Sequence, residues 1–147
     1  MSHMAKIDLH IKDLAALKKA AGLLGLEFME NQKTHKWFGR SVGDYPLPTG
    51  FTVADLGKCD HALRVKGNTS AYEIGVVRRK DGKPGFQLLW DFWQGGYGLQ
   101  DKVGKDGIKL QNEYGFEVAR KQAVAQGYTV SRQVKENGAL VLNAVKL

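Results

Sequence analysis

The sequence predicts an α+β fold in which two helices pack on one face of a mainly antiparallel sheet. Three features predict it: segments in which polar and apolar residues alternate, segments with apolar residues at helical spacing, and turns rich in glycine, asparagine and proline between them. The length predicts a single domain over residues 1–147, because a chain of this size buries one core. A ferredoxin-like or pseudo-symmetric arrangement is the more specific expectation.

The first elements are predicted to be a strand, a helix and a second strand. Residues 5–11 alternate in polarity, which is typical of a strand with one buried face. A helix is expected after Asp13, a suitable N-cap, because apolar residues then recur every three or four positions until Gly25. Glycine commonly ends a helix, and residues 26–30 are expected to continue as a strand.

Residues 31–59 are predicted to form an irregular insertion. Pro46 and Pro48 fix two backbone dihedral angles and remove two hydrogen-bond donors, which indicates turns in this segment. Long loops in small domains often carry function, so the segment is a candidate wall or lid of a binding site. The alternative is an insertion that takes no part in binding.

The centre of the chain is predicted to be an antiparallel meander. Residues 61–66, 71–79 and 86–93 have strand character and are separated by turn-forming segments. In the third of these strands, alternation places Leu88, Trp90 and Phe92 on one face, which we expect to lie beneath the helices. The other face carries Gln87, Leu89, Asp91 and Trp93 and leads into a glycine-rich loop.

The rest of the chain is predicted to be a long helix followed by a hairpin. The helix is expected over residues 101–126, with a break near Gly104 or Gly107. Gly115 lies inside it and predicts close packing against the sheet, since an interior glycine otherwise costs about 1 kcal/mol relative to alanine. A hairpin with an Asn-Gly turn is expected over residues 128–146. Both predicted helices end in a glycine followed by a strand, which favours pseudo-symmetry.

The composition narrows the classes of function. The formal net charge is +7, which favours anionic partners such as nucleotides, nucleic acid or acidic protein surfaces; the alternative is charge that serves solubility alone. No apolar run approaches the roughly 20 residues that cross a bilayer, and no secretory signal is recognisable. A single cysteine fits a reducing compartment. We therefore expect a cytoplasmic protein with no membrane partner.

The sequence predicts no metal site, no cofactor and no catalytic residue. Cys59, Asp60 and His61, with His35 upstream, lack the paired ligand spacings of structural zinc sites. No characteristic signature surrounds Cys59 to indicate a catalytic nucleophile. The glycine-rich loop after the third central strand also lacks the phosphate-binding motifs of nucleotide-binding folds.

Two carboxylates stand inside strongly apolar stretches and therefore need an explanation. Glu73 and Asp91 fall on central strands that we expect to be neighbours, so they could form a hydrolytic pair. The favoured interpretation is that they form salt bridges, with Arg64, Arg78 or Arg79 as the partners.

Aromatic and basic residues together give the strongest indication of a binding site. Aromatic side chains stack on bases and cationic side chains hold phosphates in sites for nucleotides and single-stranded nucleic acid. The alternative places the aromatic residues in the core and the basic ones in a solvated turn. The predicted ligand-binding residues are Trp93, Tyr97, Arg78, Arg79, Arg64, Asp91 and Trp37.

Several short segments resemble a small family of domains of unknown function. The family is typified by the hypothetical chloroplast reading frame thirty-five proteins of algal plastids and cyanobacteria, and it has relatives in bacteria and bacteriophages. The resemblance is weakest over residues 31–59, and it implies no catalytic residue. A distribution among phages and plastids is more typical of a binding or regulatory module than of an enzyme. The segments that carry the resemblance are 1–3, 14–26, 72–75, 91–94, 114–116 and 126–130.

We therefore expect a non-enzymatic binding protein for an anionic ligand, either a nucleotide or nucleic acid. If the chain is phage-encoded, the specific expectation is that it sequesters a nucleotide signal of host defence in the host cytoplasm. A protein–protein adaptor or regulatory subunit is the alternative, and a small hydrolase that uses Glu73 and Asp91 is less favoured. An uncovered sheet edge also predicts that two copies could form a homodimer.

Overall fold

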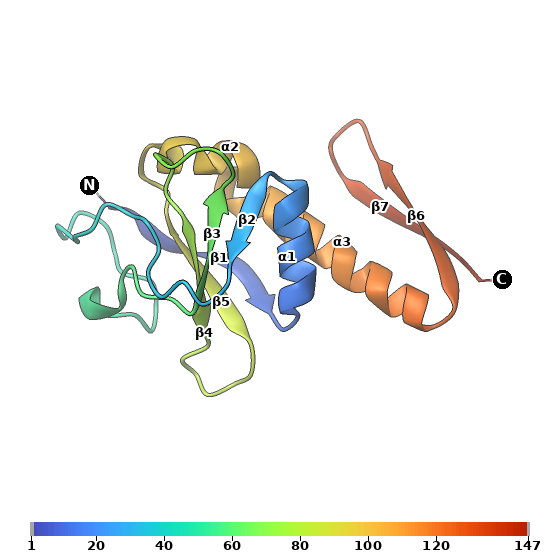
Figure 1. Ribbon diagram of the computed structural model, residues 1–147, viewed down its shortest axis with the longest axis horizontal. Helices are drawn as coiled ribbons and strands as arrows, with labels where there is room; N and C mark the ends of the chain where they lie inside the picture. Colours follow the sequence, from blue (N-terminus) through green and yellow to red (C-terminus); the bar gives the residue numbers. More distant parts are fainter. Residues whose placement is uncertain (1, 147) are drawn as a thin grey trace.

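The computed structural model describes residues 2–146 and shows a five-stranded antiparallel sheet with helices on one face (Figure 1). Its strand order is β1-β5-β4-β3-β2, and each neighbouring pair is antiparallel. The prediction of an α+β fold is therefore confirmed. The five strands are β1 (Met4–Ile11), β2 (Leu26–Met29), β3 (His61–Val65), β4 (Ile74–Arg78) and β5 (Phe86–Asp91).

Two longer helices and one short helix complete the main body. Helix α1 (Leu14–Leu23) and helix α3 (Ile108–Ala125) pack against each other, and the short helix α2 (Leu99–Val103) precedes α3. The predicted break in the long helix is confirmed. It is a 3-10 turn over Lys105–Gly107, where Gly104 and Gly107 adopt φ angles of 82° and 73° that favour glycine.

The face of the sheet beneath α1 and α3 carries the larger hydrophobic core. Ile7 and Ile11 of β1 and Leu88 and Trp90 of β5 point to this side, as the alternation in the sequence predicts. We call this core the helix-side cluster. Its buried members are Ile7, Ile11, Ala16, Leu17, Ala20, Ala21, Leu26, Leu63, Val65, Ala71, Tyr72, Ile74, Val76, Leu88, Trp90, Leu99, Val103, Leu110 and Tyr114.

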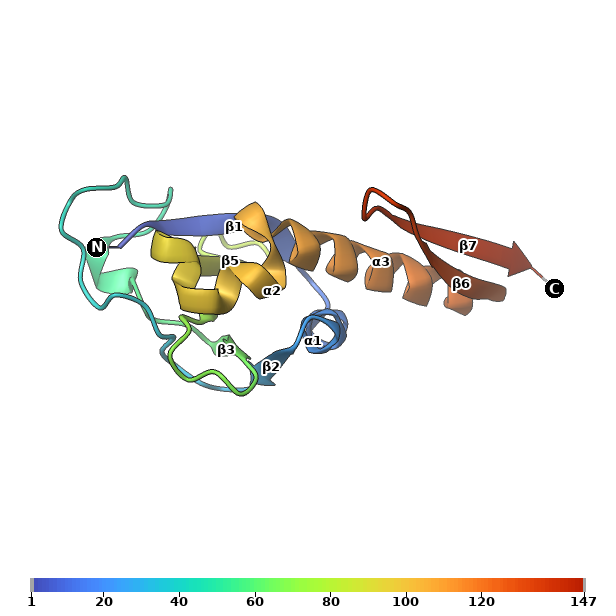
Figure 2. The same cartoon turned by 90° about the horizontal axis from the view of Figure 1, so that it is seen from above.

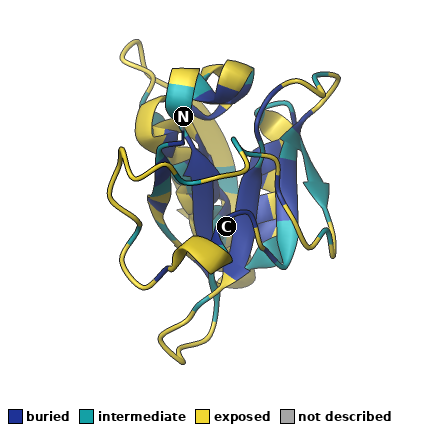
Figure 3. Cartoon of the chain, turned by 90° about the vertical axis from the view of Figure 1, so that its left-hand side faces the viewer, coloured by how far each residue is buried: buried dark blue, intermediate teal, exposed yellow. Residues whose placement is uncertain are grey.

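The opposite face is covered by the irregular segment 31–59, which lies on the other side of the sheet from the helices (Figures 1 and 2). We call the smaller core beneath it the loop-side cluster, and Trp37 and Met29 pack at its margin. Residues 74–77 of β4 are buried because both faces of the sheet are covered, and Figure 3 shows these buried strands behind mainly exposed loops. The loop-side cluster consists of Met4, Phe51, Leu56, Cys59, Ala62, Val77 and Leu89.

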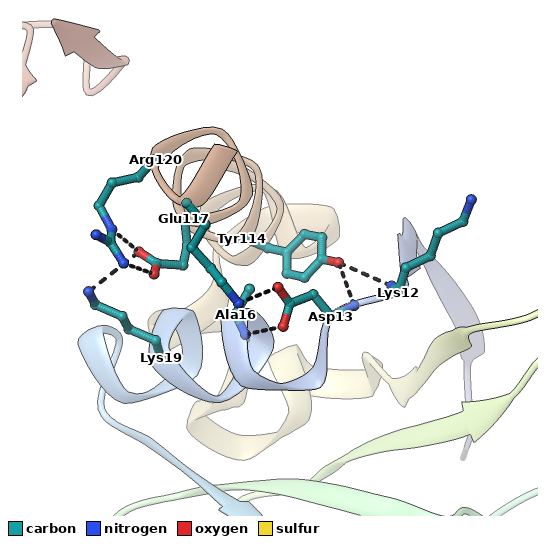
Figure 4. Close-up of polar contacts among 8 residues, drawn as sticks. Lys12, Asp13, Ala16, Lys19, Tyr114, Glu117 and Arg120 are labelled. Carbon is teal, nitrogen blue, oxygen red and sulfur yellow. Dashed lines mark hydrogen bonds and ion pairs between the residues drawn. The ribbon is translucent and has the colours of Figure 1, made fainter. Parts of the chain in front are cut away.

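Polar contacts fix α3 against the start of α1 (Figure 4). The Tyr114 hydroxyl accepts hydrogen bonds from the backbone N–H groups of Lys12 and Asp13, at 3.1 and 3.2 Å. Asp13 caps α1 as predicted, because its carboxylate accepts from the N–H of Ala16 at 3.0 Å. The same carboxylate pairs with Lys121 at 2.6 Å, and this contact lowers the pKa of Asp13. One turn of helix therefore carries both the cap and an inter-helix ion pair.

The final hairpin stands apart from the five-stranded sheet (Figures 1 and 2). Strands β6 (Tyr128–Val134) and β7 (Leu140–Lys146) form a separate two-stranded sheet that packs against α3. The ferredoxin-like expectation is therefore wrong in this respect, since the closing strands do not join the main sheet. At about 1.5 Å per residue, the 18 residues of α3 carry the chain beyond the sheet.

Two glycine predictions have different outcomes. The repeated order of helix, glycine and strand is confirmed, because Gly25 after α1 and Gly127 after α3 have φ angles of 81° and 90°. The expectation that Gly115 packs closely against the sheet is wrong. A Cβ atom at Gly115 would meet no atom within 4 Å, because this part of α3 faces the hairpin across a shallow groove.

Candidate anion-binding cleft

A cleft of about 530 Å³ opens on the loop side of the sheet. One wall is the outer face of β1, with Lys6, Asp8 and His10. The other walls are the loop that ends at Phe51 and residues 79–81, which follow β4. Residues far apart in the sequence therefore meet at one place because the insertion folds back over the edge strand.

Two lysines approach the same aromatic ring at this cleft. The Nζ atom of Lys6 lies 5.6 Å from the centroid of the Phe51 ring, and the Nζ atom of Lys80 lies 5.2 Å from it. These distances are within the range of cation–π attraction. Phe51 is buried and lines the cleft, so both ammonium groups lie near the same part of its wall.

The two lysines differ in their other contacts. Lys80 pairs with Asp55 at 3.2 Å. The N–H group of Thr52, and then Lys80, lower the pKa of the Asp55 carboxyl. Lys6 makes no ion pair with any residue between positions 2 and 146. Its positive charge is therefore available to an incoming anion.

Arg79 also lines the cleft, and its guanidinium group contacts two neighbouring side chains. Its Nε atom donates to Asp81 at 3.2 Å, and its Nη1 atom donates to the Nδ1 atom of His10 at 3.1 Å. The guanidinium holds the pKa of the Asp81 carboxyl at about 2, so this carboxylate stays ionised and neutralises Arg79. Asp8 remains as the other acidic residue of the wall. Since Asp55 pairs with Lys80, the positive charge at this cleft that no carboxylate pairs with in the described chain is that of Lys6.

Arg79 is the member of the predicted binding set that lines this cleft, and the other arginines lie elsewhere. Arg64 on β3 pairs with Glu27 on β2 at 3.2 Å. The guanidinium of Arg78 covers the ring of Phe86 at 5.5 Å. Because each is already engaged, the three arginines do not form one cationic site.

The predicted aromatic residues are also distributed over different sites. Trp37 packs so closely over Gly57 that a Cβ atom there would lie 2.2 Å from the indole nitrogen. The rings of Trp93 and His3 pack edge to face, with centroids 4.8 Å apart. The ring of Tyr97, which is about half exposed, contacts Tyr72 with centroids 5.0 Å apart.

Asp91 has a structural role in the protein. Its carboxylate is fully buried and accepts hydrogen bonds from the backbone N–H groups of His3, Phe38 and Trp93, at 3.0, 3.1 and 3.1 Å. It thereby joins the N-terminal segment, the insertion and the end of β5. With these bonds made, the side chain is enclosed by protein and does not face the cleft.

Glu73 is held in a similar way at the start of β4. Its Oε1 atom accepts from the Nε2 atom of Gln32 at 2.9 Å and from the backbone N–H of Lys36 at 2.8 Å. The predicted salt bridges of Glu73 and Asp91 to arginine are therefore wrong. The irregular segment 31–59 forms no strand of the sheet, so its backbone N–H groups need other acceptors. The carboxylate of Glu73 accepts from the N–H of Lys36, and that of Asp91 accepts from the N–H of Phe38.

The histidine and cysteine of the insertion are buried beside these carboxylates. Burial lowers the pKa of His35, whose Nδ1 atom lies 3.1 Å from the carbonyl oxygen of Glu73. Burial also raises the pKa of the Cys59 thiol to about 12, and this thiol donates to the carbonyl oxygen of Gln32 at 3.1 Å. Within residues 2–146, His, Cys, Asp and Glu side chains form no group of three or more that could hold a metal ion.

Sequence reasoning missed the residues that define the cleft. Lys6 counts only as a polar position in an alternating strand, and Phe51 follows two prolines with no local pattern. Lys80 belongs to the basic run after β4, where alternation ends. One signal in the sequence could have indicated this cleft. Lys6 lies on the outward face of a predicted strand, and the long irregular segment 31–59 could fold over that face.

Comparisons with known proteins give no further assignment. No family model matches the chain, and neither a curated protein nor a solved structure matches it significantly. The resemblance to the reading frame thirty-five family therefore stays a prediction. Across residues 2–146, the helices are too short or too polar to cross a membrane.

Proposed function

We propose that the chain binds a small anionic ligand of the nucleotide class in the cleft beside Phe51. The observation that carries this proposal is that the ammonium groups of Lys6 and Lys80 lie 5.6 and 5.2 Å from the centroid of one aromatic ring, that of Phe51. Two cations that approach the same ring repel each other, and an anion bound beside that ring relieves the repulsion.

The size and lining of the cleft support a ligand larger than an inorganic ion. Its volume of about 530 Å³ lies within the range of roughly 300–1,000 Å³ that is usual for small-molecule sites. Phe51 and Leu9 supply apolar surface, and Gln87 supplies an amide. The Oε1 atom of Gln87 is buried without a hydrogen-bond partner in the described chain, so a ligand N–H group that reached it would satisfy it.

The charge pattern favours a phosphate group as the anionic part of the ligand. A phosphate has several acceptor oxygens and so can accept from more than one donor, whereas Asp8 on the same wall disfavours a ligand made only of negative charge. A nucleotide meets both requirements, because its base and sugar are uncharged. It also fits a bounded cleft better than a long nucleic acid strand does.

Calorimetric titration with mononucleotides, cyclic dinucleotides and a single-stranded oligonucleotide tests this proposal. We expect saturable binding of at least one nucleotide, and we expect Lys6→Glu to weaken it by about tenfold or more, since it reverses a charge at the anion. Lys18→Glu is the matched control: it makes the same change at an exposed lysine of α1 that has no ion pair with a described residue.

Two results would contradict the proposal. One is a wild-type protein that binds none of these ligands at low salt, where electrostatic binding is strongest. The other is an equal loss of affinity in Lys6→Glu and Lys18→Glu, which would show that only the net charge of the protein matters. If only the oligonucleotide bound tightly, the ligand would be single-stranded nucleic acid and not a nucleotide.

A further inference from the structure

The arm formed by the second half of α3 and the β6–β7 hairpin lacks a core of its own. From Val118 to Lys146 no residue is buried. Val134 and Val145 are 59% and 61% exposed, although both lie in strands. An isolated two-stranded hairpin is at best marginally stable in water and needs further strands or packing against a helix. Here α3 packs against the hairpin but leaves every residue of β6 and β7 at least partly exposed. The arm therefore has the properties of an element that is completed by a partner.

The hairpin has open edges that lack the usual protection against pairing with another chain. Its seven residue pairs run in continuous register from Tyr128–Lys146 to Val134–Leu140, without a bulge. Neither strand contains proline. Natural edge strands are commonly protected by charges, prolines or bulges. Here Arg132 on β6 is bound to Glu113, and Lys146 stands at the end of β7.

Both surfaces around the arm are nearly free of charge. The groove between α3 and the hairpin is lined by residues such as Gly115, Phe116, Leu140 and Leu142, none of which is charged. The outward face of the hairpin carries Thr129, Ser131, Gln133, Val141, Asn143 and Val145, also without charge. Depletion of charge is typical of the centre of a protein–protein interface and not of a surface that binds nucleic acid.

Strand β7 is complementary to an antiparallel copy of itself. Full overlap of Leu140–Lys146 with that copy places Asn143 at the centre, opposite Asn143 of the second copy. Val141 then faces Val145, and Leu142 faces Ala144, so apolar side chains meet apolar ones. The two central amides can hydrogen-bond to each other. Lys146 faces Leu140, so no like charges are opposed.

The backbone of β7 also presents free bonding groups at this edge. The N–H of Lys135 donates to the carbonyl oxygen of Ala139 at 2.9 Å. Along an antiparallel hairpin, residue pairs that exchange backbone hydrogen bonds alternate with pairs that do not. Counting from this bond, the N–H groups of Leu142 and Ala144 point away from β6. On β6, the corresponding self-pairing would centre on Ser131 and bring the two Arg132 side chains close together. Charge therefore favours β7 over β6.

We propose that two copies of this chain associate through β7 and form a continuous four-stranded sheet in the order β6-β7-β7-β6. The pairing is closed and two-fold symmetric, because both copies use the same edge. It places the exposed Val145 of each copy opposite Val141 of the other copy. The proposal is independent of ligand binding in the cleft, since none of the cleft residues belongs to the arm.

Sedimentation equilibrium of the full chain over a wide range of concentration, with paired variants, tests the proposal. We expect wild type to reach twice the mass of the chain. Asn143→Lys should weaken association by about tenfold or more, because it places like charges directly opposite each other. Ser131→Lys is the matched control: it adds the same charge to the same face, opposite Asn143 in the hairpin, but about three strand spacings from its copy in the dimer.

A mixing experiment makes the assignment specific. Asn143→Lys and Asn143→Glu should each be monomeric alone and should form a heterodimer when mixed, because the central charges are then opposite. Circular dichroism of each variant is the control that tests whether these exposed substitutions leave the fold intact. A wild type that stays monomeric at every concentration, equal weakening by Ser131→Lys, or no rescue on mixing would each overturn the β7 interface.

Discussion

At the residue scale, Asp91 shows how one side chain can organise three segments of the chain. Its two carboxylate oxygens accept from three backbone N–H groups, which belong to the N-terminal segment, the insertion and the turn after β5. A buried carboxylate is costly unless it is fully hydrogen-bonded, and here backbone donors do this without any cation. The same three donors would be unpaired without it.

We predict that Asp91→Asn lowers the free energy of unfolding by at least about 2 kcal/mol, measured by urea denaturation. The amide keeps one acceptor oxygen but turns an NH₂ group toward the backbone donors that the carboxylate satisfied. Glu30→Gln is the control, since it makes the same chemical change at an exposed residue with no side-chain hydrogen bond in the described chain. Equal stability of the two variants would show that Asp91 does not join these segments.

At the element scale, the sheet is stabilised by two different covers. Helices α1 and α3 cover one face with regular apolar stripes. The insertion covers the other face with a few large side chains, among them Phe51 and Leu56. His35 of the insertion lies against β4, where a Cβ atom at Gly75 would be 2.5 Å from its ring. Gly75 is therefore needed for the insertion to approach the sheet.

Two glycine-to-alanine substitutions should change the free energy of unfolding in opposite directions, one through helix propensity and the other through close packing. Gly22→Ala in α1 should raise the free energy of unfolding by about 0.5–1 kcal/mol, because the site is exposed and a Cβ atom meets nothing within 4 Å. Gly75→Ala should lower it, since His35 would have to move. Thermal unfolding measures both, and a stabilising Gly75→Ala would contradict the packing of His35 on β4.

At the scale of the whole molecule, the chain consists of a body with two covered faces and an arm without buried residues. The buried residues of α3 lie between Leu110 and Glu117, and the helix continues beyond them. Two glutamates lie where the buried part of α3 ends. Glu113 pairs with Arg132 of β6, and Glu117 pairs with Arg120 of α3. The arm is therefore connected to the body by one helix and a few ion pairs.

We predict that a chain ending at Gln126 keeps the fold of the body and loses self-association. Neither hydrophobic cluster includes a residue of β6 or β7, so removal of the hairpin should lower the free energy of unfolding by no more than about 1 kcal/mol. Circular dichroism and sedimentation measure the two effects. An unfolded product would show that the hairpin supports the body, and a dimeric product would place the interface elsewhere.

Local regularities were predictable from the sequence. Alternation identified both faces of β5, although the predicted strand over residues 86–93 extends two residues beyond the end of β5 at Asp91. The glycines at 25, 104, 107 and 127 marked the ends and the break of the helices. These features depend on neighbouring residues, since backbone sterics and the burial of one face act over a few positions. The partners of Glu73 and Asp91 were not predictable, because an irregular loop has no periodicity to show which donors it brings.

The sequence by itself determined the α+β class, the meander and the repeated order of helix, glycine and strand, because each follows from short-range periodicity. Only the tertiary structure decided that the insertion covers the second face, that Lys6 and Lys80 meet at Phe51, and that the last hairpin stays outside the main sheet. The physical reason is that these contacts join segments far apart in the sequence. Their geometry depends on the path of a loop and the length of a helix, which no local pattern encodes.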